Sequence, residues 1–214
     1  MVIFGLTGSI GMGKTTTAGM LRRLGVPVHD ADQTVHRLLA PGGGAVAAVV
    51  AAFGPELMGK DGGIDRRRLG ARVFCNPAAL ARLEAILHPL VRKRERYFLA
   101  AAARRRNRLV ALDVPLLFET HGERRVDATV VVSAPAFVQR ARVLARPGMT
   151  SDRFNTILKR QYPDAVKRRR ADFVVPTGLG KPHAFRQLVR IVRQLSRYQG
   201  RHWPVRRQDL RLGA

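Results

Sequence analysis

The chain is poor in cysteine and has no long apolar run. Cys75 is the single cysteine among 214 residues, which excludes an internal disulfide and makes a cytoplasmic location the expectation. Cys75 itself lies in an apolar stretch, where a buried structural thiol is the interpretation we favour. No apolar run approaches the roughly 20 residues that a membrane span requires. The N-terminus leads straight into a predicted strand, so we expect neither a membrane helix nor a signal peptide.

Acidic residues are also scarce. The sequence holds 15 Asp and Glu against 39 Lys and Arg, a formal net charge of +24. Such an excess attracts polyanions, whether nucleotides, nucleic acids or an anionic membrane. The basic residues are scattered in short clusters, which is typical of a solvated surface, and no nucleic-acid recognition motif accompanies them. Specific nucleic-acid binding is therefore not expected, although the charge keeps a nucleic-acid-binding ATPase as an alternative.

A complete phosphate-binding motif stands near the N-terminus. Residues 2–6 predict a buried strand, residues 8–15 match G-x-x-x-x-G-K-[ST], and a predicted amphipathic helix follows. Glycines let backbone N–H groups surround a polyphosphate, and the helix directs its positive end at the anion. Lys14 adds a charge for the terminal phosphates, and the hydroxyl of Thr15 can ligate Mg²⁺. This segment predicts a site for a nucleoside triphosphate with Mg²⁺.

The element that reads guanine in switch GTPases, Asn-Lys-x-Asp, is missing. The asparagines of the chain are Asn76, Asn107 and Asn155, and none of them is followed by lysine. The sequence therefore argues against a guanine-specific GTPase.

The remaining pattern predicts an α/β protein, a P-loop NTPase-type parallel sheet flanked by helices. Further strands are expected over residues 25–29, 109–114, 127–132 and 172–175. Roughly 80 residues separate the second strand from the third, far more than the ~10–15 of an ordinary helical crossover. This stretch has a helical pattern, with a break expected at His88-Pro89. The predicted divisions are a nucleotide-binding core (1–32, 107–135 and 171–198), a helical substrate-binding subdomain (33–106), a lid (136–170) and a basic C-terminal tail (199–214).

Three carboxylates stand at predicted strand ends, where ligands bind in an open α/β sheet. Asp113 ends the third strand, where P-loop proteins place a Mg²⁺ carboxylate; capping of a turn is the alternative. Asp30 and Asp32 end the second strand and are candidates for the base that activates an acceptor hydroxyl. Capping of the next helix is an equally good interpretation. The pair can also divide the roles, with Asp32 on the substrate and Asp30 either near the metal or as the cap.

Two arginines are candidates for contacts with the transferred phosphate. Arg142 and Arg146 lie on a helix predicted over residues 136–146, and their spacing of four places them on one face. Guanidinium groups suit transferring phosphates because of their charge and fork geometry. We predict that both act as clamps on a mobile lid, with an ordinary surface role as the alternative in so basic a chain.

Further elements follow the phosphate loop in a characteristic order. They are Asp30-Ala31-Asp32, Leu87-His88-Pro89, Asp113-Val114-Pro115-Leu116-Leu117-Phe118-Glu119, Gln139 with Arg142 and Arg146, Gln161 and Ala171-Asp172. Over residues 1 to about 195, this order resembles the dephospho-CoA kinase family. The Asp-Ala-Asp, His-Pro and Pro-Leu-Leu-Phe-Glu elements are more specific than the phosphate loop.

The resemblance implies an activity and a site. ATP would phosphorylate the ribose 3′-hydroxyl of dephospho-CoA, the last step of coenzyme A biosynthesis, on a P-loop core with a CoA-binding subdomain and a lid. The implied catalytic residues are Asp32 as general base, Lys14, Arg142 and Arg146. The implied ATP site consists of Gly8, Gly11, Met12, Gly13, Lys14, Thr15, Thr16, Arg142 and Arg146. The implied acceptor site consists of Asp32, His88, Pro115, Leu116, Leu117 and Glu119, and the expected metal ligands are Thr15 and Asp113.

The chain departs from the family pattern after the last strand. It reads Pro176-Thr177-Gly178 where the family usually has an asparagine before the glycine, so contacts there, including contacts to adenine, are in question. The nearest alternative function is another P-loop kinase that acts on a nucleoside or nucleotide.

Overall fold

The computed structural model describes residues 1–74 and 76–204. Cys75, predicted as a buried thiol, and residues 205–214 of the predicted tail lie outside this part of the chain. The chain forms two compact units, one of Met1–His29 with Ala102–Ala214 and one of Asp30–Ala101. Each unit is described by itself below.

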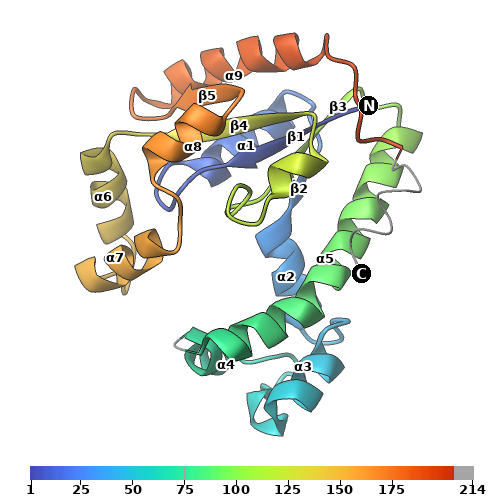
Figure 1. The fold of residues 1–214 in the computed structure, drawn as a ribbon, viewed down its shortest axis with the longest axis vertical. Coiled ribbons are helices and arrows are strands. Elements are labelled where there is room, and N and C mark those ends of the chain that lie inside the picture. Colours follow the sequence, from blue (N-terminus) through green and yellow to red (C-terminus); the bar gives the residue numbers. More distant parts are fainter. Residues whose placement is uncertain (75, 205–214) are drawn as a thin grey trace. The chain divides into compact units, whose positions relative to one another are not determined.

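A five-stranded parallel sheet organises the first unit and confirms the predicted fold class (Figure 1). The strand order is β2-β3-β1-β4-β5. Every residue of β1, β3 and β4 is buried, which explains why these strands are continuous apolar runs rather than alternating ones. The strands are β1 (Val2–Thr7), β2 (Val28–Asp30), β3 (Leu109–Asp113), β4 (Ala128–Ser133) and β5 (Phe173–Pro176).

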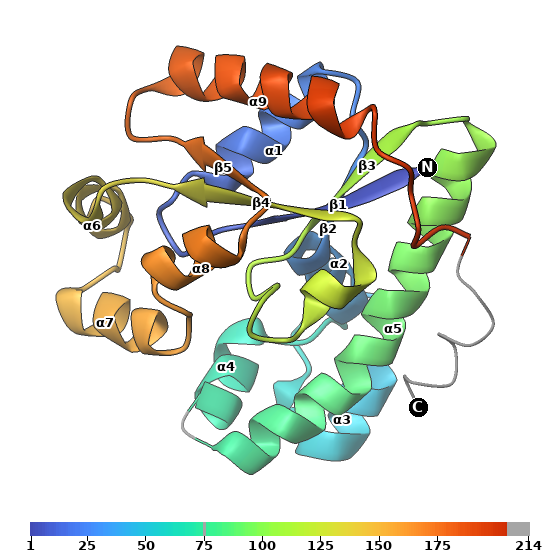
Figure 2. The same ribbon diagram turned by 45° about the horizontal axis from the view of Figure 1, so that its top comes forward.

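Helices cover both sides of this sheet. Figure 2 shows α1 and α9 on one side and α8 on the other, with α6 and α7 beyond the ends of the strands. The core between the sheet and its helices includes the buried side chains of Phe4, Leu21 and Leu188. The sequence pattern did not predict α8, because its Asp-Ala-Val-Lys-Arg-Arg-Arg carries no apolar stripe. The helices are α1 (Lys14–Arg23), α6 (Ala136–Leu144), α7 (Ser151–Lys159), α8 (Asp164–Arg170), α9 (Lys181–Leu195) and the short 3-10 helix η2 (Gly122–Arg125).

The register of the strands places the segments that follow β1, β3, β4 and β5 at one edge of the sheet. Leu6 of β1 is paired with Asp113 of β3, and Ser133 of β4 is paired with Pro176 of β5. Because the strands are parallel, their carboxyl ends meet there, which is where ligands bind in open α/β sheets. The phosphate loop, residues 114–119 and residues 177–180 therefore start from the same edge.

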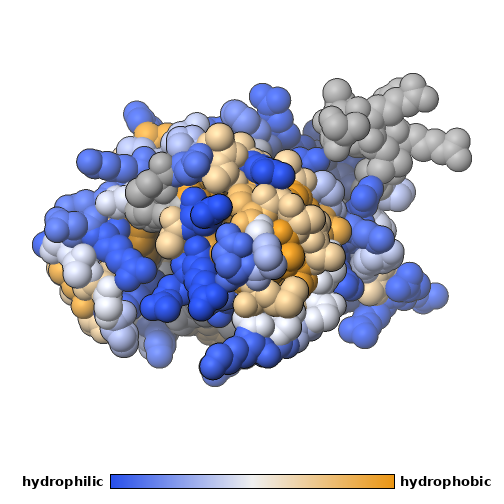
Figure 3. Space-filling model, turned by 90° about the horizontal axis from the view of Figure 1, so that it is seen from below, coloured by the Kyte–Doolittle hydropathy of each residue, from blue (hydrophilic) through white to orange (hydrophobic). Residues whose placement is uncertain are grey.

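The second unit is helical. Its core joins buried side chains such as Leu38, Val49, Leu69 and Leu87. Helix α3 consists only of Val, Ala and Phe, and Figure 3 shows apolar residues gathered in a patch that hydrophilic side chains surround. The elements are α2 (Ala31–Leu39), α3 (Val46–Phe53), the short 3-10 helix η1 (Pro55–Leu57), α4 (Arg66–Phe74) and α5 (Pro77–Arg104), whose last residues belong to the first unit.

The break predicted at His88-Pro89 is wrong. Helix α5 runs uninterrupted for 28 residues with Pro89 inside it. An internal proline costs about 3 kcal/mol through a lost hydrogen bond and a steric clash. Leu83 and Leu87 are buried just before it, and Leu90 and Val91 pack on the same core. Since each buried side chain of this kind contributes ~1.5–3 kcal/mol, the apolar face of the helix outweighs the proline.

In the part of the chain that the structure describes, no helix combines the length and the apolar character needed to cross a bilayer.

Candidate active site

The phosphate loop connects β1 to α1 and is shaped by its glycines. Gly13, the residue before α1, has φ 91°, a left-handed conformation that favours glycine, and no side chain caps the helix. A Cβ on Gly8 would collide with the side chain and the carbonyl oxygen of Val132, so the loop lies directly on β4. Since the first-turn N–H groups of a helix have no partners within it, the N-terminus of α1 presents donors and a positive dipole end to an anion.

Lys14 and Asp113 form a short ion pair beside this loop. The Nζ of Lys14 lies 2.6 Å from Oδ1 of Asp113, and the two side chains are 16% and 2% exposed. The pairing of Leu6 with Asp113 in the sheet brings the carboxylate to the loop. The sequence predicted both residues for the site, and the structure brings them together.

The residues expected to hold Mg²⁺ have the right donor chemistry. Asp113 offers a carboxylate at the sheet edge, and Thr15 is an exposed hydroxyl in the first turn of α1. Hard oxygen donors of this kind suit Mg²⁺, which usually takes one or two protein ligands and completes its shell with water and substrate phosphates. Within residues 1–74 and 76–204, no group of three or more His, Cys, Asp or Glu side chains could hold a metal ion. The donor set thus fits a metal that is held partly by phosphates.

Two glutamines hold the loop at Ile10. The N–H of Ile10 donates to Oε1 of Gln161 at 3.0 Å, and Nε2 of Gln139 donates to the carbonyl of Ile10 at 2.8 Å. Gln139 is on α6 and Gln161 follows α7. Together they hold the two peptide groups that flank the Cα of Ile10, a role that the sequence pattern did not predict for them.

Met12 contributes to the loop through its backbone. Its side chain is only 2% exposed, and its sulfur accepts a hydrogen bond from the N–H of Ala134 at 3.1 Å. Its carbonyl accepts from the hydroxyl of Thr177 at 2.7 Å. The side chain is thus part of the core.

Arg142 on α6 contacts the phosphate loop, whereas Arg146 lies beyond the end of that helix. Nη1 of Arg142 donates to the hydroxyl of Thr177 at 3.0 Å and to the carbonyl of Gly11 at 3.5 Å, and Nη2 donates to the carbonyl of Thr177 at 2.8 Å. Helix α6 ends at Leu144, so the expectation that both arginines lie on one helix face is wrong. Arg146 sits in the following turn, whose backbone bond to Val143 closes the helix early.

The segment after β3 is anchored by a buried lysine. Lys167 on α8 has no exposed side-chain surface; its Nζ lies 2.9 Å from Oε1 of Glu119 and donates to the carbonyl of Pro115 at 3.2 Å. Of the predicted acceptor residues here, Leu117 is buried and Leu116 is exposed. Lys167 was missed because it lies in a run of basic residues that looks like solvated surface.

The helical unit carries the remaining predicted residues. Asp30 caps α2, with Oδ1 accepting from the N–H of Gln33 at 2.8 Å. Asp32 is exposed in the first turn of α2, and His88 is exposed on α5. The capping alternative therefore applies to Asp30, and the carboxylate of Asp32 is not the cap.

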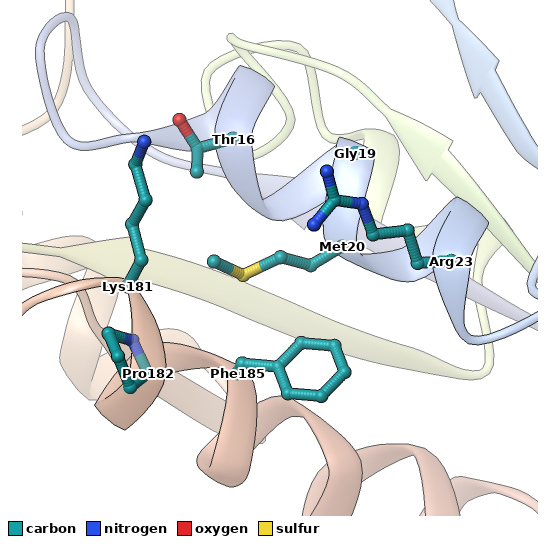
Figure 4. Close-up of a pocket in the computed structure, with 7 residues that line it drawn as sticks. All are labelled: Thr16, Gly19, Met20, Arg23, Lys181, Pro182 and Phe185. Atoms are coloured by element: carbon teal, nitrogen blue, oxygen red, sulfur yellow. The ribbon is translucent and has the colours of Figure 1, made fainter.

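A pocket of about 480 Å³ lies between α1 and α9 (Figure 4). Figure 4 shows Met20 and Phe185 on opposite sides of it, and the amine of Lys181 extending toward Thr16. An apolar lining with cations at the rim suits a planar ligand that carries an anionic group. The lining residues are Thr16, Gly19, Met20, Arg23, Lys181, Pro182 and Phe185.

Comparison with known proteins shows the family of the chain. The family model of dephospho-CoA kinase matches residues 2–179. A protein named dephospho-CoA kinase from Paramagnetospirillum magneticum is 67% identical over 168 residues, which cover 78% of this chain and 78% of the relative. A protein of the same name from Rhodospirillum rubrum is 63% identical over 187 residues, which cover 87% of this chain and 88% of the relative. The crystal structure of TT1252 from Thermus thermophilus matches with a TM-score of 0.79 at 35% identity, covering 90% of this chain and 96% of that one. The chain belongs to the dephospho-CoA kinase family.

Proposed function

We propose that this chain transfers the γ-phosphate of ATP to the ribose 3′-hydroxyl of dephospho-CoA, which gives coenzyme A in the last step of its biosynthesis. The observation that carries the proposal is the ion pair of Lys14 and Asp113 at a complete phosphate loop, in a chain that the family model matches over residues 2–179. ATP is the co-substrate and Mg²⁺ the metal of this family.

On the donor side, the loop and Lys14 bind the polyphosphate. The N–H groups at the start of α1 and the Nζ of Lys14 supply donors to the phosphate oxygens. Arg142, held beside Gly11, and Arg146 add positive charge. Mg²⁺, held by Thr15 and Asp113, would neutralise phosphate charge when bound. Because such groups act on charge that grows during transfer, they lower the barrier to the reaction.

On the acceptor side, Asp32 is the general base. It takes the proton of the 3′-hydroxyl as the oxygen forms a bond to the γ-phosphorus, and the bond from that phosphorus to the β,γ-bridging oxygen breaks to release ADP. The exposure of Asp32 and the use of Asp30 as the helix cap support this division of roles. We assign His88, Pro115, Leu116, Leu117 and Glu119 to the acceptor site.

We also propose a role for each division of the chain that the sequence predicts. Residues 33–106 would bind the CoA moiety, residues 136–170 would form the lid, and residues 199–214 a basic tail, with the enzyme working in the cytoplasm. Specific nucleic-acid binding is not part of this function despite the formal charge of +24.

The test is an acceptor screen with the purified protein. ADP formation from ATP and Mg²⁺ is measured with dephospho-CoA, with nucleosides, with nucleoside monophosphates, and with RNA or DNA. We expect turnover with dephospho-CoA, and a product that carries a new 3′-phosphate. No turnover with dephospho-CoA contradicts the proposal, and stimulation by nucleic acid that survives moderate salt supports a nucleic-acid-dependent ATPase instead.

A further inference from the structure

The hydroxyl of Thr177 connects the phosphate loop to Arg142. Thr177 directly follows β5 and is 8% exposed. Its Oγ1 donates to the carbonyl of Met12 at 2.7 Å and accepts from Nη1 of Arg142 at 3.0 Å. Nη2 of the same arginine donates to the carbonyl of Thr177 at 2.8 Å. One residue therefore holds both the loop backbone and the fork of the guanidinium.

The backbone and the side-chain rotation of Thr177 are restricted as well. Its N–H donates to the carbonyl of Ser133 at 2.8 Å, which continues the pairing of β4 and β5. A Cβ added to Gly13 would lie 3.3–3.4 Å from the Oγ1, Cβ and Cγ2 of Thr177, so the threonine side chain lies directly over this glycine. Its χ1 rotation is restricted because threonine is β-branched. The sheet edge thus sets the position of the hydroxyl.

We propose that Thr177 is a positioning residue for phosphoryl transfer, which aligns Arg142 with the phosphate loop before ATP binds. The proposal rests on the proposed function, because it assigns Arg142 to the phosphates. Donors that are already aimed at the place where charge develops need no rearrangement during the reaction. Thr177 acts through Met12 and Arg142 and is not itself a catalytic residue.

The chemistry explains why a hydroxyl is required at this position. The oxygen must accept from a cation and donate to a carbonyl at the same time, which serine and threonine can do and valine cannot. The two hydrogen bonds differ in strength, since the one from the guanidinium is charge-assisted.

The experiment compares Thr177→Val, Thr177→Ser and wild type in the full chain. Steady-state kinetics give kcat and KM for ATP at saturating dephospho-CoA, and calorimetry gives the affinity for ATP without acceptor. Losing a hydrogen bond to a charged group predicts a roughly tenfold to hundredfold fall in kcat/KM for ATP in Thr177→Val. Thr177→Ser keeps both bonds and is expected within about threefold of wild type.

A double-mutant cycle and a matched control separate positioning from stability. In an Arg142→Ala background, Thr177→Val is expected to lower kcat/KM clearly less than in the wild type, because only the hydrogen bond to Met12 then remains to be lost. Thr129 is also a buried threonine, on β4, and its hydroxyl donates to Oδ2 of Asp172 at 2.8 Å. Thr129→Val is expected to lower the melting temperature without changing the kinetics for ATP. Thr177→Ala repeats the test if the valine variant does not fold.

Three outcomes would overturn the proposal: unchanged ATP kinetics in Thr177→Val, an equal loss in the Arg142→Ala background, or no rescue by serine. If dephospho-CoA is not a substrate for the wild type, the proposed function fails. In that case the calorimetric affinities for ATP still decide whether Thr177 and Arg142 are coupled.

Discussion

The sheet unit holds two lysine–carboxylate ion pairs whose lysines differ in their exposure. Lys14 lies 2.6 Å from Asp113 and keeps 16% of its side-chain surface exposed, whereas Lys167 lies 2.9 Å from Glu119 and has none. Lys167 also donates to the carbonyl of Pro115. The same chemistry thus gives one lysine that an incoming phosphate can reach and one lysine that is fixed in the interior.

The helical unit repeats this contrast with two aspartates. The carboxylate of Asp30 accepts the N–H of Gln33 as the cap of α2, while Asp32, two residues later, is exposed. In each unit, one charged group is held by the protein and a similar one is accessible to a ligand. The comparison predicts that the accessible group governs activity and that the held group governs stability.

The largest effect is expected for Lys14→Met. Lys14 supplies the loop with its positive side chain. An arginine that stabilises the transferring phosphoryl group in GTPases contributes about 10³–10⁵-fold to the rate, and we expect an effect on that scale for this lysine. We expect kcat/KM to fall about 10⁴-fold with little change in secondary structure. The measurement is ADP formation with dephospho-CoA, alongside circular dichroism. A loss of less than tenfold would show that this pair is as structural as that of Lys167.

Asp32→Asn is expected to have the next largest effect. An asparagine cannot take the proton of the acceptor hydroxyl, and general base catalysis is worth roughly 10²–10⁴-fold. We expect kcat to fall about 10³-fold while calorimetry shows an unchanged affinity for ATP. Asp30→Asn is the matched control: asparagine caps helices as well as aspartate does, so activity and stability should stay close to wild type. Equal losses in both variants would remove the distinction between the two aspartates.

Lys167→Met tests the fixed member of the lysine comparison. Removing one partner of a buried ion pair costs about 3–5 kcal/mol, because the remaining carboxylate is left without its counter-charge. In a chain of this size, such a loss lowers the melting temperature by roughly 6–20 °C. The kcat/KM for ATP of the folded fraction should stay near wild type. An unchanged melting temperature, or a loss of ATP kinetics without destabilisation, would contradict the assignment.

Local patterns were enough to predict the parts of the site that depend on neighbouring residues. The phosphate loop is defined by consecutive residues, and Asp113 follows from the position of a strand end. Contacts between distant segments were not predictable: Thr177 and Met12 are 165 residues apart, and Ile10 and Gln161 are 151 apart. Which of the many polar side chains meets the loop depends on the order in which the strands pair, and that order is decided by segments far apart in the sequence.

In helix α5, by contrast, a strong local signal gave a wrong prediction. Pro89 predicted a break, yet the helix continues through it. Propensity is a weak guide where a helix buries a long apolar face, and the side chains of Leu83 and Leu87 provide that burial on one side of the proline. The sequence therefore predicted the fold class, whereas burial and long-range pairing decided which distant side chains contact the phosphate loop.

The smallest effect is expected for the exposed pair of Asp65 and Arg68, where Oδ2 lies 3.3 Å from Nε. The N–H of Arg68, followed by that of Arg67, lowers the pKa of the Asp65 carboxyl from its usual 3.8. Because the pKa in the folded state is below that of the unfolded chain, the contribution to stability is present above the unfolded pKa. It is lost as pH falls through the folded value. NMR titration of the carboxyl should give a midpoint below 3.8, and Asp65→Asn should change urea unfolding only slightly at pH 7. A titration midpoint at or above the usual pKa would show that these N–H groups do not stabilise the carboxylate. A large loss of stability in Asp65→Asn would show that this exposed ion pair contributes as much as the buried pair of Lys167.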